Sequence, residues 1–147
     1  MTYLLDVNVL IALIEPNHPH NNAALTWFDA TGKLGWATCP MTENAVVRIV
    51  GHPSYPNWPG SPAIVAGLLS RFRKHSGHLF WPDDISLLDR RRIDLSRMLN
   101  SSQVTDSYLL ALAIAHGGQL ATLDRRLIPD AVRNGAQGLH LIGPSAL

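Results

Sequence analysis

The chain has 147 residues, of which 46% are hydrophobic and 16% charged, and its formal net charge is +1. This length allows one domain, over residues 1–147, with a substantial buried core, and this composition excludes a disordered chain. The small net charge excludes a strong general attraction to nucleic acid, so any such contact would depend on local basic patches.

Cysteine content and hydropathy indicate the compartment. The single cysteine, Cys39, leaves no internal disulfide and is typical of a reducing compartment, so we expect the cytoplasm. The apolar N-terminal run is a poor signal peptide, because no basic segment precedes it and Asp6 interrupts it. No uninterrupted apolar stretch is long enough to span a bilayer, so we expect no membrane contact.

The N-terminal segment passes from one apolar stretch through a carboxylate into a second apolar stretch. Residues 3–5 are expected to form a short buried strand, and residues 8–14 a helix packed against it. Asp6 would then lie at the carboxyl end of a strand, where open α/β sheets bind their ligands. Burying a carboxylate there is costly unless it is paired or bound to a cation. Alternatively, Asp6 caps the helix.

A second helix and a second strand are expected to follow. Asn21 or Asn22 can cap the helix, which ends near Gly32. Residues 34–38 have the apolar character of a short strand, and Pro40 ends it.

The third expected helix carries an acid in its first turn. Thr42 can cap this helix over residues 43–50. A glutamate at position 43 is ordinary helix chemistry, because the helix dipole favours a negative charge there. Glu43 also follows the end of a strand, however, as Asp6 does.

The middle of the chain contains fewer functional signals. Residues 51–62 are rich in proline, glycine and asparagine and indicate a loop, residues 63–74 a helix, and residues 78–81 a third strand. We expect Asp83 and Asp84 to cap a short helix that follows, rather than to ligate a metal.

A basic run and the most apolar helix come next. The run of residues 89–92, Asp-Arg-Arg-Arg, is either a solvated helix face or linker, or a patch that contacts phosphate. Residues 103–115 form a helix that is apolar nearly all round, which indicates a central and buried position. Asp106 lies in its first turn.

The C-terminal part again runs from a strand into an acid. Residues 119–123 indicate a fourth strand followed by Asp124, residues 127–132 a short helix, and residues 139–142 a last edge strand. The arginines after Asp124 either pair with carboxylates or contact phosphate. Strands that alternate with helices indicate an α/β fold with a parallel sheet covered on both faces.

Four acids share one expected position in this fold. Asp6 and Asp124 follow strands, whereas Glu43 and Asp106 begin helices, and all of these ends lie at the same edge of a parallel sheet. Crowded carboxylates raise one another's pKa, so the site must hold protons or bind a cation. Carboxylate oxygens select a hard cation, Mg²⁺ or Mn²⁺, and such a cation suits the hydrolysis of a phosphodiester.

The acids also lie in motifs that resemble those of a known family. These motifs are Leu5-Asp6-Val-Asn8, Thr42-Glu43-Asn44 with Arg48, Thr105-Asp106-Ser-Tyr, and Thr122-Leu-Asp124-Arg. They resemble the four acidic motifs of the PIN-domain nucleases, and the whole chain is similar to the VapC-type toxins of bacterial and archaeal toxin–antitoxin pairs. Any one motif alone would be weak, but their order and spacing are specific.

The resemblance implies a fold, an activity and partners. The fold would be a PIN-like α/β/α sandwich with a mainly parallel sheet of about five strands. The activity would be that of a Mg²⁺- or Mn²⁺-dependent endoribonuclease that cuts tRNA, rRNA or mRNA and so inhibits translation and growth. A VapB-type antitoxin would hold the toxin inactive, and the protein would form a homodimer and a higher-order toxin–antitoxin complex.

The resemblance also assigns roles to residues of this chain. Asp6 and Asp106 would ligate the metal, with Asp124 as a third ligand, directly or through water. Glu43 would ligate the metal or orient the attacking water. Thr122 and Asn8 would support these carboxylates. The candidate RNA contacts are Arg90, Arg91, Arg92, Arg125 and Arg126.

Two other functions are compatible with parts of this pattern. A phosphatase that uses Asp6 as a phosphorylated nucleophile would need a second aspartate two residues on, where this chain has Asn8. A non-catalytic PIN-like module that binds RNA or protein is the other alternative. The complete set of four acids disfavours it.

Overall fold

The computed structural model describes residues 1–143, and within them lies a five-stranded sheet in the order β3-β2-β1-β4-β5. All four pairs of neighbouring strands are parallel. The strands are β1 (Tyr3–Leu5), β2 (Trp36–Thr38), β3 (His78–Phe80), β4 (Gln119–Thr122) and β5 (Leu139–Leu141). The expected α/β fold with a parallel sheet of five strands is therefore confirmed.

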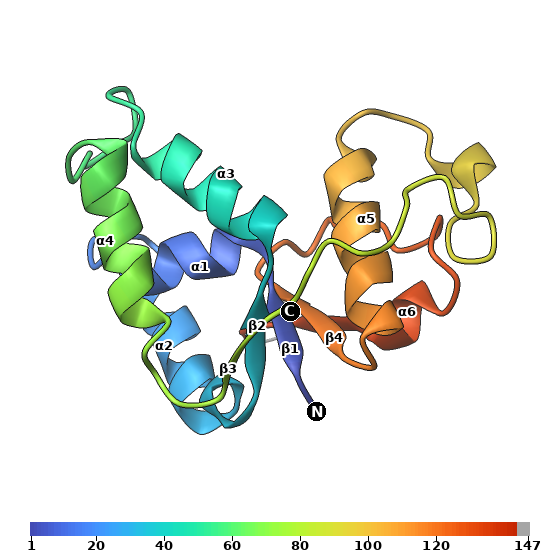
Figure 1. Ribbon diagram of the computed structural model, residues 1–147, viewed down its shortest axis with the longest axis horizontal. Helices are drawn as coiled ribbons and strands as arrows, with labels where there is room; N and C mark the ends of the chain where they lie inside the picture. Colours follow the sequence, from blue (N-terminus) through green and yellow to red (C-terminus); the bar gives the residue numbers. More distant parts are fainter. Residues whose placement is uncertain (144–147) are drawn as a thin grey trace.

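Helices cover both faces of the sheet (Figure 1). On one side lie α1 (Val7–Ile14), α2 (Asn21–Ala30), α3 (Pro40–Val50) and α4 (Pro62–Phe72), and on the other lie α5 (Gln103–Ala115) and α6 (Gly135–Gly138). Two short 3-10 helices, η1 (Gly32–Leu34) and η2 (Leu95–Arg97), lie in the connections. Among residues 1–143, no helix has the length and apolar character needed to cross a bilayer.

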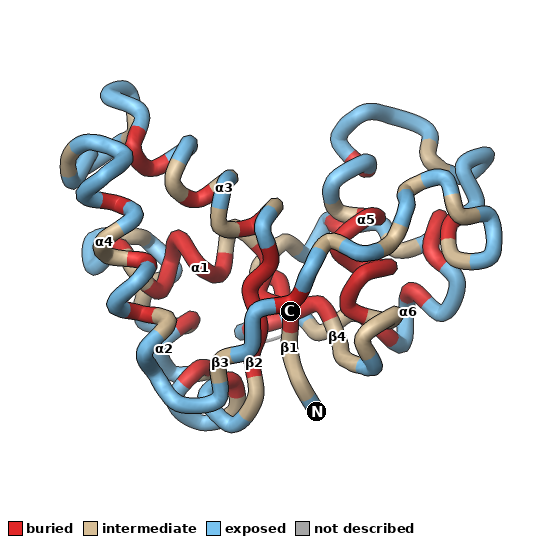
Figure 2. Tube along the Cα trace, viewed as in Figure 1, coloured by how far each residue is buried: buried red, intermediate tan, exposed pale blue. Residues whose placement is uncertain are grey.

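Each face of the sheet packs into its own hydrophobic cluster. Successive residues of a strand point to opposite faces, so Leu5 packs with α1 to α4, whereas Leu4 packs with α5. Both side chains are fully buried. Figure 2 shows buried backbone along the central strands, α1 and α5, which explains why these segments are the most apolar in the sequence.

The third helix begins earlier than the sequence suggests. It begins at Pro40 and not after Thr42, and Cys39 is its N-cap residue. Proline is well suited to the first position of a helix, because its missing N–H would have no partner there. Thr42 lies in the first turn and accepts a hydrogen bond from the Cys39 N–H at 3.0 Å. The expectation that Thr42 caps the helix is therefore wrong.

Two expected caps act elsewhere. No helix forms over residues 85–88; instead, Asp83 accepts a hydrogen bond from the Met41 N–H at 3.1 Å and so caps α3. Helix α2 is preceded by His20, and neither Asn21 nor Asn22 caps it. The Asn21 side chain donates to the Ala12 carbonyl at 2.8 Å, which ties α2 to α1.

The helix expected over residues 127–132 is also absent. Pro129 lacks an N–H, residues 130–131 form a turn in which the Val132 N–H donates to the Pro129 carbonyl at 3.1 Å, and Val132 forms an antiparallel bridge with Ile93. The Asp94 N–H donates to the Ala131 carbonyl at 2.8 Å and strengthens the link. The chain becomes helical only at α6.

Candidate active site

Strands β1 and β4 end side by side. Leu5 is paired with Ala121 in the parallel register, and the Asp6 N–H donates to the Ala121 carbonyl at 2.9 Å. Asp6, which follows β1, and Thr122, the last residue of β4, therefore lie at the same edge of the sheet. The Thr122 hydroxyl donates to Asp6 Oδ2 at 2.7 Å.

Backbone and amide groups hold the Asp6 carboxylate from its other sides. The Val7 N–H donates to Asp6 Oδ1 at 2.7 Å, so Asp6 also caps α1. The Asn8 amide donates to Thr122 Oγ1 at 3.2 Å and to Asp6 Oδ2 at 3.4 Å, and its oxygen accepts from the Leu123 N–H at 3.1 Å. Asn8 thus joins the ends of β1 and β4, as a supporting residue should.

The third member of this group follows β4. The Asp124 N–H donates to Thr122 Oγ1 at 3.1 Å, and Asp124 Oδ1 accepts from the Arg126 N–H at 2.9 Å. One threonine hydroxyl therefore contacts both Asp6 and the backbone of Asp124. Thr122 itself is fully buried, so these contacts form away from water.

Asp106 reaches the same group from the first turn of α5. Partial burial, together with the smaller effects of the Asp6 and Asp124 charges, raises its pKa to about 6. The pKa of Asp6 is also raised, mainly by burial and in part by Asp124, although hydrogen bonds from Thr122 and Val7 lower it. These three aspartates are thus close enough to influence one another's ionisation.

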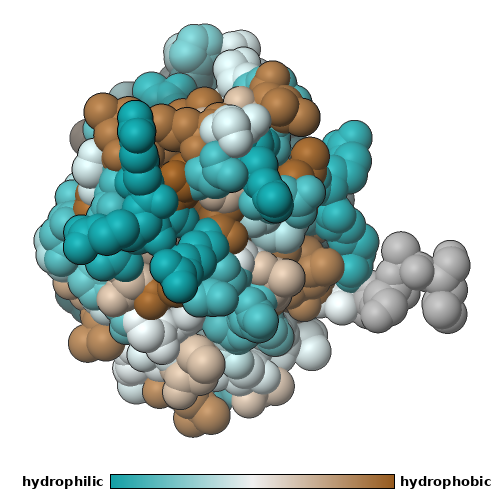
Figure 3. Space-filling view, turned by 90° about the vertical axis from the view of Figure 1, so that its right-hand side faces the viewer, coloured by the Kyte–Doolittle hydropathy of each residue, from teal (hydrophilic) through white to brown (hydrophobic). Residues whose placement is uncertain are grey.

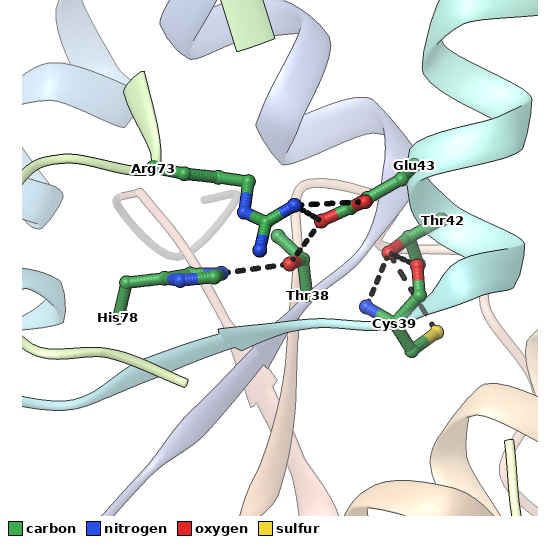
Figure 4. Close-up of polar contacts among 6 residues, drawn as sticks. All are labelled: Thr38, Cys39, Thr42, Glu43, Arg73 and His78. Atoms are coloured by element: carbon green, nitrogen blue, oxygen red, sulfur yellow. Dashed lines mark hydrogen bonds and ion pairs between the residues drawn. The ribbon is translucent and has the colours of Figure 1, made fainter. Parts of the chain in front are cut away.

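Glu43 lies in the first turn of α3, close to the end of β2, and has partners of its own (Figure 4). The Thr38 hydroxyl donates to Glu43 Oε2 at 2.7 Å. Arg73 Nη1 is 3.2 Å from Oε2 and 3.3 Å from Oε1. The fold therefore groups three aspartates around β1 and β4 and places the fourth acid beside an arginine.

The three aspartates have the chemistry of a site for a hard cation. Within residues 1–143, no group of three or more His, Cys, Asp or Glu side chains is arranged to hold a metal ion. The oxygen donors around Asp6 are carboxylate, hydroxyl and amide groups, which Mg²⁺ and Mn²⁺ prefer. Burial, and to a smaller extent the charges of neighbouring aspartates, raises the pKa values of Asp6 and Asp106, and a bound cation would oppose both effects. The donor atoms of these residues thus suit a divalent cation, whereas the described side chains are not already arranged as its ligands.

Residues 3–131 match the PIN domain family. The chain belongs to this family. It is 43% identical over 141 residues to ribonuclease VapC44 of Mycobacterium tuberculosis, which covers 96% of the chain and 98% of the relative. It is 45% identical over 131 residues to ribonuclease VapC39 of the same species, which covers 89% of the chain and 94% of the relative. These matches place the PIN domain among the VapC ribonucleases.

A solved structure has the same fold as this PIN domain. The crystal structure of VapBC2 from Rickettsia felis, bound to a DNA fragment from their promoter, matches with a TM-score of 0.60. The match covers 97% of this chain and 100% of that chain, at 13% identity. At this identity the match shows the fold alone.

The candidate RNA contacts lie in two places on the PIN domain. Arg125 and Arg126 directly follow Asp124, and the Arg125 guanidinium donates to the Ile142 carbonyl at 3.4 Å. The other three lie in the connection between β3 and α5. Figure 3 shows the side of the molecule that carries α5 and α6, where hydrophilic side chains lie next to apolar surface. The three arginines line an open pocket of about 390 Å³; its five arginines are Arg90, Arg91, Arg92, Arg97 and Arg133.

Sequence reasoning missed two polar residues beside Glu43. Thr38 is the last residue of β2, as Thr122 is the last residue of β4, and this shared position was a usable signal. Arg73 immediately follows α4, where a basic residue is common, so its sequence position gave no sign of a partner.

Proposed function

We propose that this PIN domain is a Mg²⁺- or Mn²⁺-dependent endoribonuclease and the toxin of a VapBC-type toxin–antitoxin pair. The observation that supports this most strongly is the group of Asp6, Asp106 and Asp124, in which burial and, to a smaller extent, neighbouring charges raise the pKa values of Asp6 and Asp106. The relatives of this PIN domain are named ribonucleases, which agrees with hydrolysis of RNA.

In this proposal, the aspartates bind the cation, and hydrogen bonds from neighbouring residues fix the position of the aspartates. When bound, a divalent cation lowers the pKa of a water molecule and stabilises negative charge on a phosphoryl group. Asp6, Asp106 and Asp124 would be its ligands, directly or through water. Thr122 keeps one oxygen of Asp6 in place, and Asn8 fixes the distance between the two strand ends.

Glu43 would orient the attacking water and accept its proton. Its carboxylate is partly exposed, with 20% of the side chain accessible, and it is oriented by Thr38 and Arg73. No side chain is needed as a covalent nucleophile, because water attacks the phosphate in line.

RNA would be held by basic patches, because the net charge of the chain is only +1. Arg125 and Arg126 lie next to Asp124 and would contact phosphates near the cut. Arg90, Arg91 and Arg92, between β3 and α5, would contact a second part of the RNA. Asp89 Oδ1 lies 3.2 Å from Arg91 Nε, so Arg91 would exchange the Asp89 carboxylate for an RNA phosphate when RNA binds.

The proposed partners follow from the relatives. The solved structure of similar fold contains a VapBC pair, and the sequence relatives are VapC proteins. We therefore propose a VapB-type antitoxin, a homodimer that joins a higher-order toxin–antitoxin complex, and action in the cytoplasm.

Asp6→Asn tests the activity. This change keeps the shape of the side chain but removes one negative charge from the aspartate group. We expect cleavage of a labelled RNA with Mn²⁺ to fall by about a hundredfold or more, while the circular dichroism spectrum stays the same. Asp29→Asn, at an exposed aspartate of α2 that pairs with Lys33, is the matched control and should cut RNA normally. Full activity of Asp6→Asn would refute the proposed metal site.

A further inference from the structure

Arg73 contacts both carboxylate oxygens of Glu43 through one nitrogen. The backbone places this arginine firmly, because its N–H donates to the Leu69 carbonyl at 3.0 Å at the end of α4. Its guanidinium also lies over the ring of Phe80, 5.3 Å from the ring centroid. The position of Arg73 is thus set by α4, β3 and Glu43 together.

A second set of contacts reaches Glu43 from the sheet (Figure 4). The Thr38 hydroxyl has a single proton, which it donates to Glu43 Oε2. His78 Nε2 lies 2.8 Å from the same hydroxyl oxygen and must therefore be the donor in that contact. The hydrogen bonds run in one direction, from His78 to Thr38 to Glu43. Both oxygens of Glu43 are consequently held in place.

The four acids therefore fall into two electrostatic classes. The aspartates raise pKa values within their group, whereas Glu43 has a positive charge within 3.3 Å. An isolated pair at the surface would stabilise the fold by only about 0–1 kcal/mol, so stability alone gives little reason for this arrangement. Glu43 is bound to Thr38 at the end of β2, which is the same edge of the sheet at which β1 and β4 end, and this location suggests a role in the reaction.

We propose that Arg73 is a positioning residue that keeps Glu43 out of the cation's ligand set and holds it as the acceptor of the water proton. This inference rests on the proposed ribonuclease activity and adds to it the role of one residue. Without Arg73, the Glu43 carboxylate would be uncompensated at the same edge of the sheet as the aspartates. It would then strengthen cation binding but no longer hold the orientation that the reaction needs.

Arg73→Gln tests this inference, with Arg71→Gln as the matched control on the exposed surface of the same helix. Mn²⁺ affinity is measured by isothermal titration calorimetry, and kcat and KM by cleavage of a labelled RNA. We expect Arg73→Gln to bind Mn²⁺ about three- to tenfold more tightly. We also expect its kcat to fall about tenfold or more with little change in KM. Arg71→Gln should change neither quantity.

The Glu43→Gln background shows whether Arg73 acts through Glu43. There, the further change Arg73→Gln should alter neither Mn²⁺ affinity nor kcat. Arg73→Lys keeps the positive charge and should retain the Mn²⁺ affinity of the original protein and part of its kcat. This variant also serves as the test should Arg73→Gln fail to fold.

Three results would overturn the inference. They are an unchanged or weaker Mn²⁺ affinity in Arg73→Gln, an equal effect of Arg71→Gln, and an effect of Arg73→Gln that persists in Glu43→Gln. A protein that binds Mn²⁺ but cuts no RNA would instead refute the proposed activity. The calorimetric comparison would still decide whether Arg73 keeps Glu43 away from the cation.

Discussion

Two threonines at strand ends organise the acids of this PIN domain. Thr122 ends β4 and donates to Asp6 at 2.7 Å, and Thr38 ends β2 and donates to Glu43 at the same distance. Each hydroxyl also accepts a hydrogen bond, from the Asp124 N–H and from His78 respectively. A threonine at this position is therefore fully hydrogen-bonded while it orients a carboxylate, although it is buried in the sheet.

The pKa of Asp106 predicts a dependence of stability on pH. Because this pKa rises from the ordinary 3.8 to about 6, the folded protein binds a proton more tightly than the unfolded chain. The stabilisation from Asp106 is complete below pH 4 and is lost as the pH rises through 6. Asparagine does not ionise, so the Asp106→Asn variant does not lose stability at this position as the pH rises. In EDTA, its melting temperature should therefore rise above that of the original protein between pH 4 and pH 6, then stay above it.

Differential scanning calorimetry across this pH range measures the effect. Asp29→Asn is the control, because Asp29 lies on an exposed face and pairs with Lys33. Its melting temperature should follow that of the original protein. A difference for Asp106→Asn that is the same at pH 4 and pH 7 would contradict the raised pKa.

At the residue scale, the sequence predicted the acids but not all of their neighbours. Asp6, Asp106 and Asp124 come together because they follow strands or begin a helix, which the hydropathy pattern reveals. Thr122 was predicted from its motif. Arg73 was not, because its contact with Glu43 spans 30 residues and depends on where α4 ends. The assigned roles of these residues remain predictions.

Among the elements, predictions succeeded where local interactions define the ends. Helix α5 runs from Gln103 to Ala115 as expected, because its apolar residues continue until two glycines. The start of α3 was misplaced, since the helix begins at Pro40, and Asp83, from another part of the chain, accepts the Met41 N–H in its first turn. Over residues 127–132, a turn and the bridge between Ile93 and Val132 likewise take the place of the expected helix, and no local pattern indicates that bridge.

Two glycines, one within α4 and one between α4 and β3, differ in the backbone conformation that they adopt and in the space around them. Gly77 has a φ of +85°, and a Cβ there would lie 2.2 Å from the Lys33 carbonyl oxygen. Gly77→Ala should therefore lower the free energy of unfolding by about 1–3 kcal/mol or more. Gly67 lies within α4 with open space around it, so Gly67→Ala should raise this free energy by about 0.5–1 kcal/mol.

Urea denaturation of both variants measures these changes, and each variant is the control for the other. The two substitutions add the same methyl group, so opposite signs would identify the local backbone as the cause. Equal stability of Gly77→Ala and the original protein would contradict the close contact with Lys33.

The sequence predicted the fold class and the family of the whole molecule better than it predicted the ends of elements or the contacts of single residues. Alternating strands and helices predicted the α/β class, and the motif order predicted the PIN-domain family; both are confirmed. The order of the strands was not predicted, because short strands of similar composition do not specify their neighbours. That order puts β1 between β2 and β4 and so brings the ends that carry the acids together.

The distribution of charge over the molecule predicts how RNA binding depends on salt. With a net charge of +1, affinity must come from patches such as the pocket lined by Arg90. Each phosphate contact contributes to the slope of log affinity against log salt concentration. Arg90→Gln should lower the magnitude of this slope by about one and weaken binding. Arg71→Gln, which removes a charge from α4, should leave the slope unchanged.

Filter binding of a labelled RNA hairpin in the Asp6→Asn background measures this slope without cleavage. The salt concentration is varied at constant Mn²⁺. Equal slopes for Arg90→Gln and Arg71→Gln would show that the pocket lined by Arg90 does not hold RNA.

The late place of β4 in the chain determines when the acidic site can form during translation. Strand β4 lies between β1 and β5 in the sheet, yet it is fourth of the five strands in chain order. During translation, Asp6 leaves the ribosome early, but its partners Thr122 and Asp124 are more than a hundred codons behind. The proposed ribonuclease therefore cannot assemble its centre on a nascent chain shorter than this. A ribosome that makes this chain is thus not exposed to the proposed nuclease activity before Asp124 has been translated.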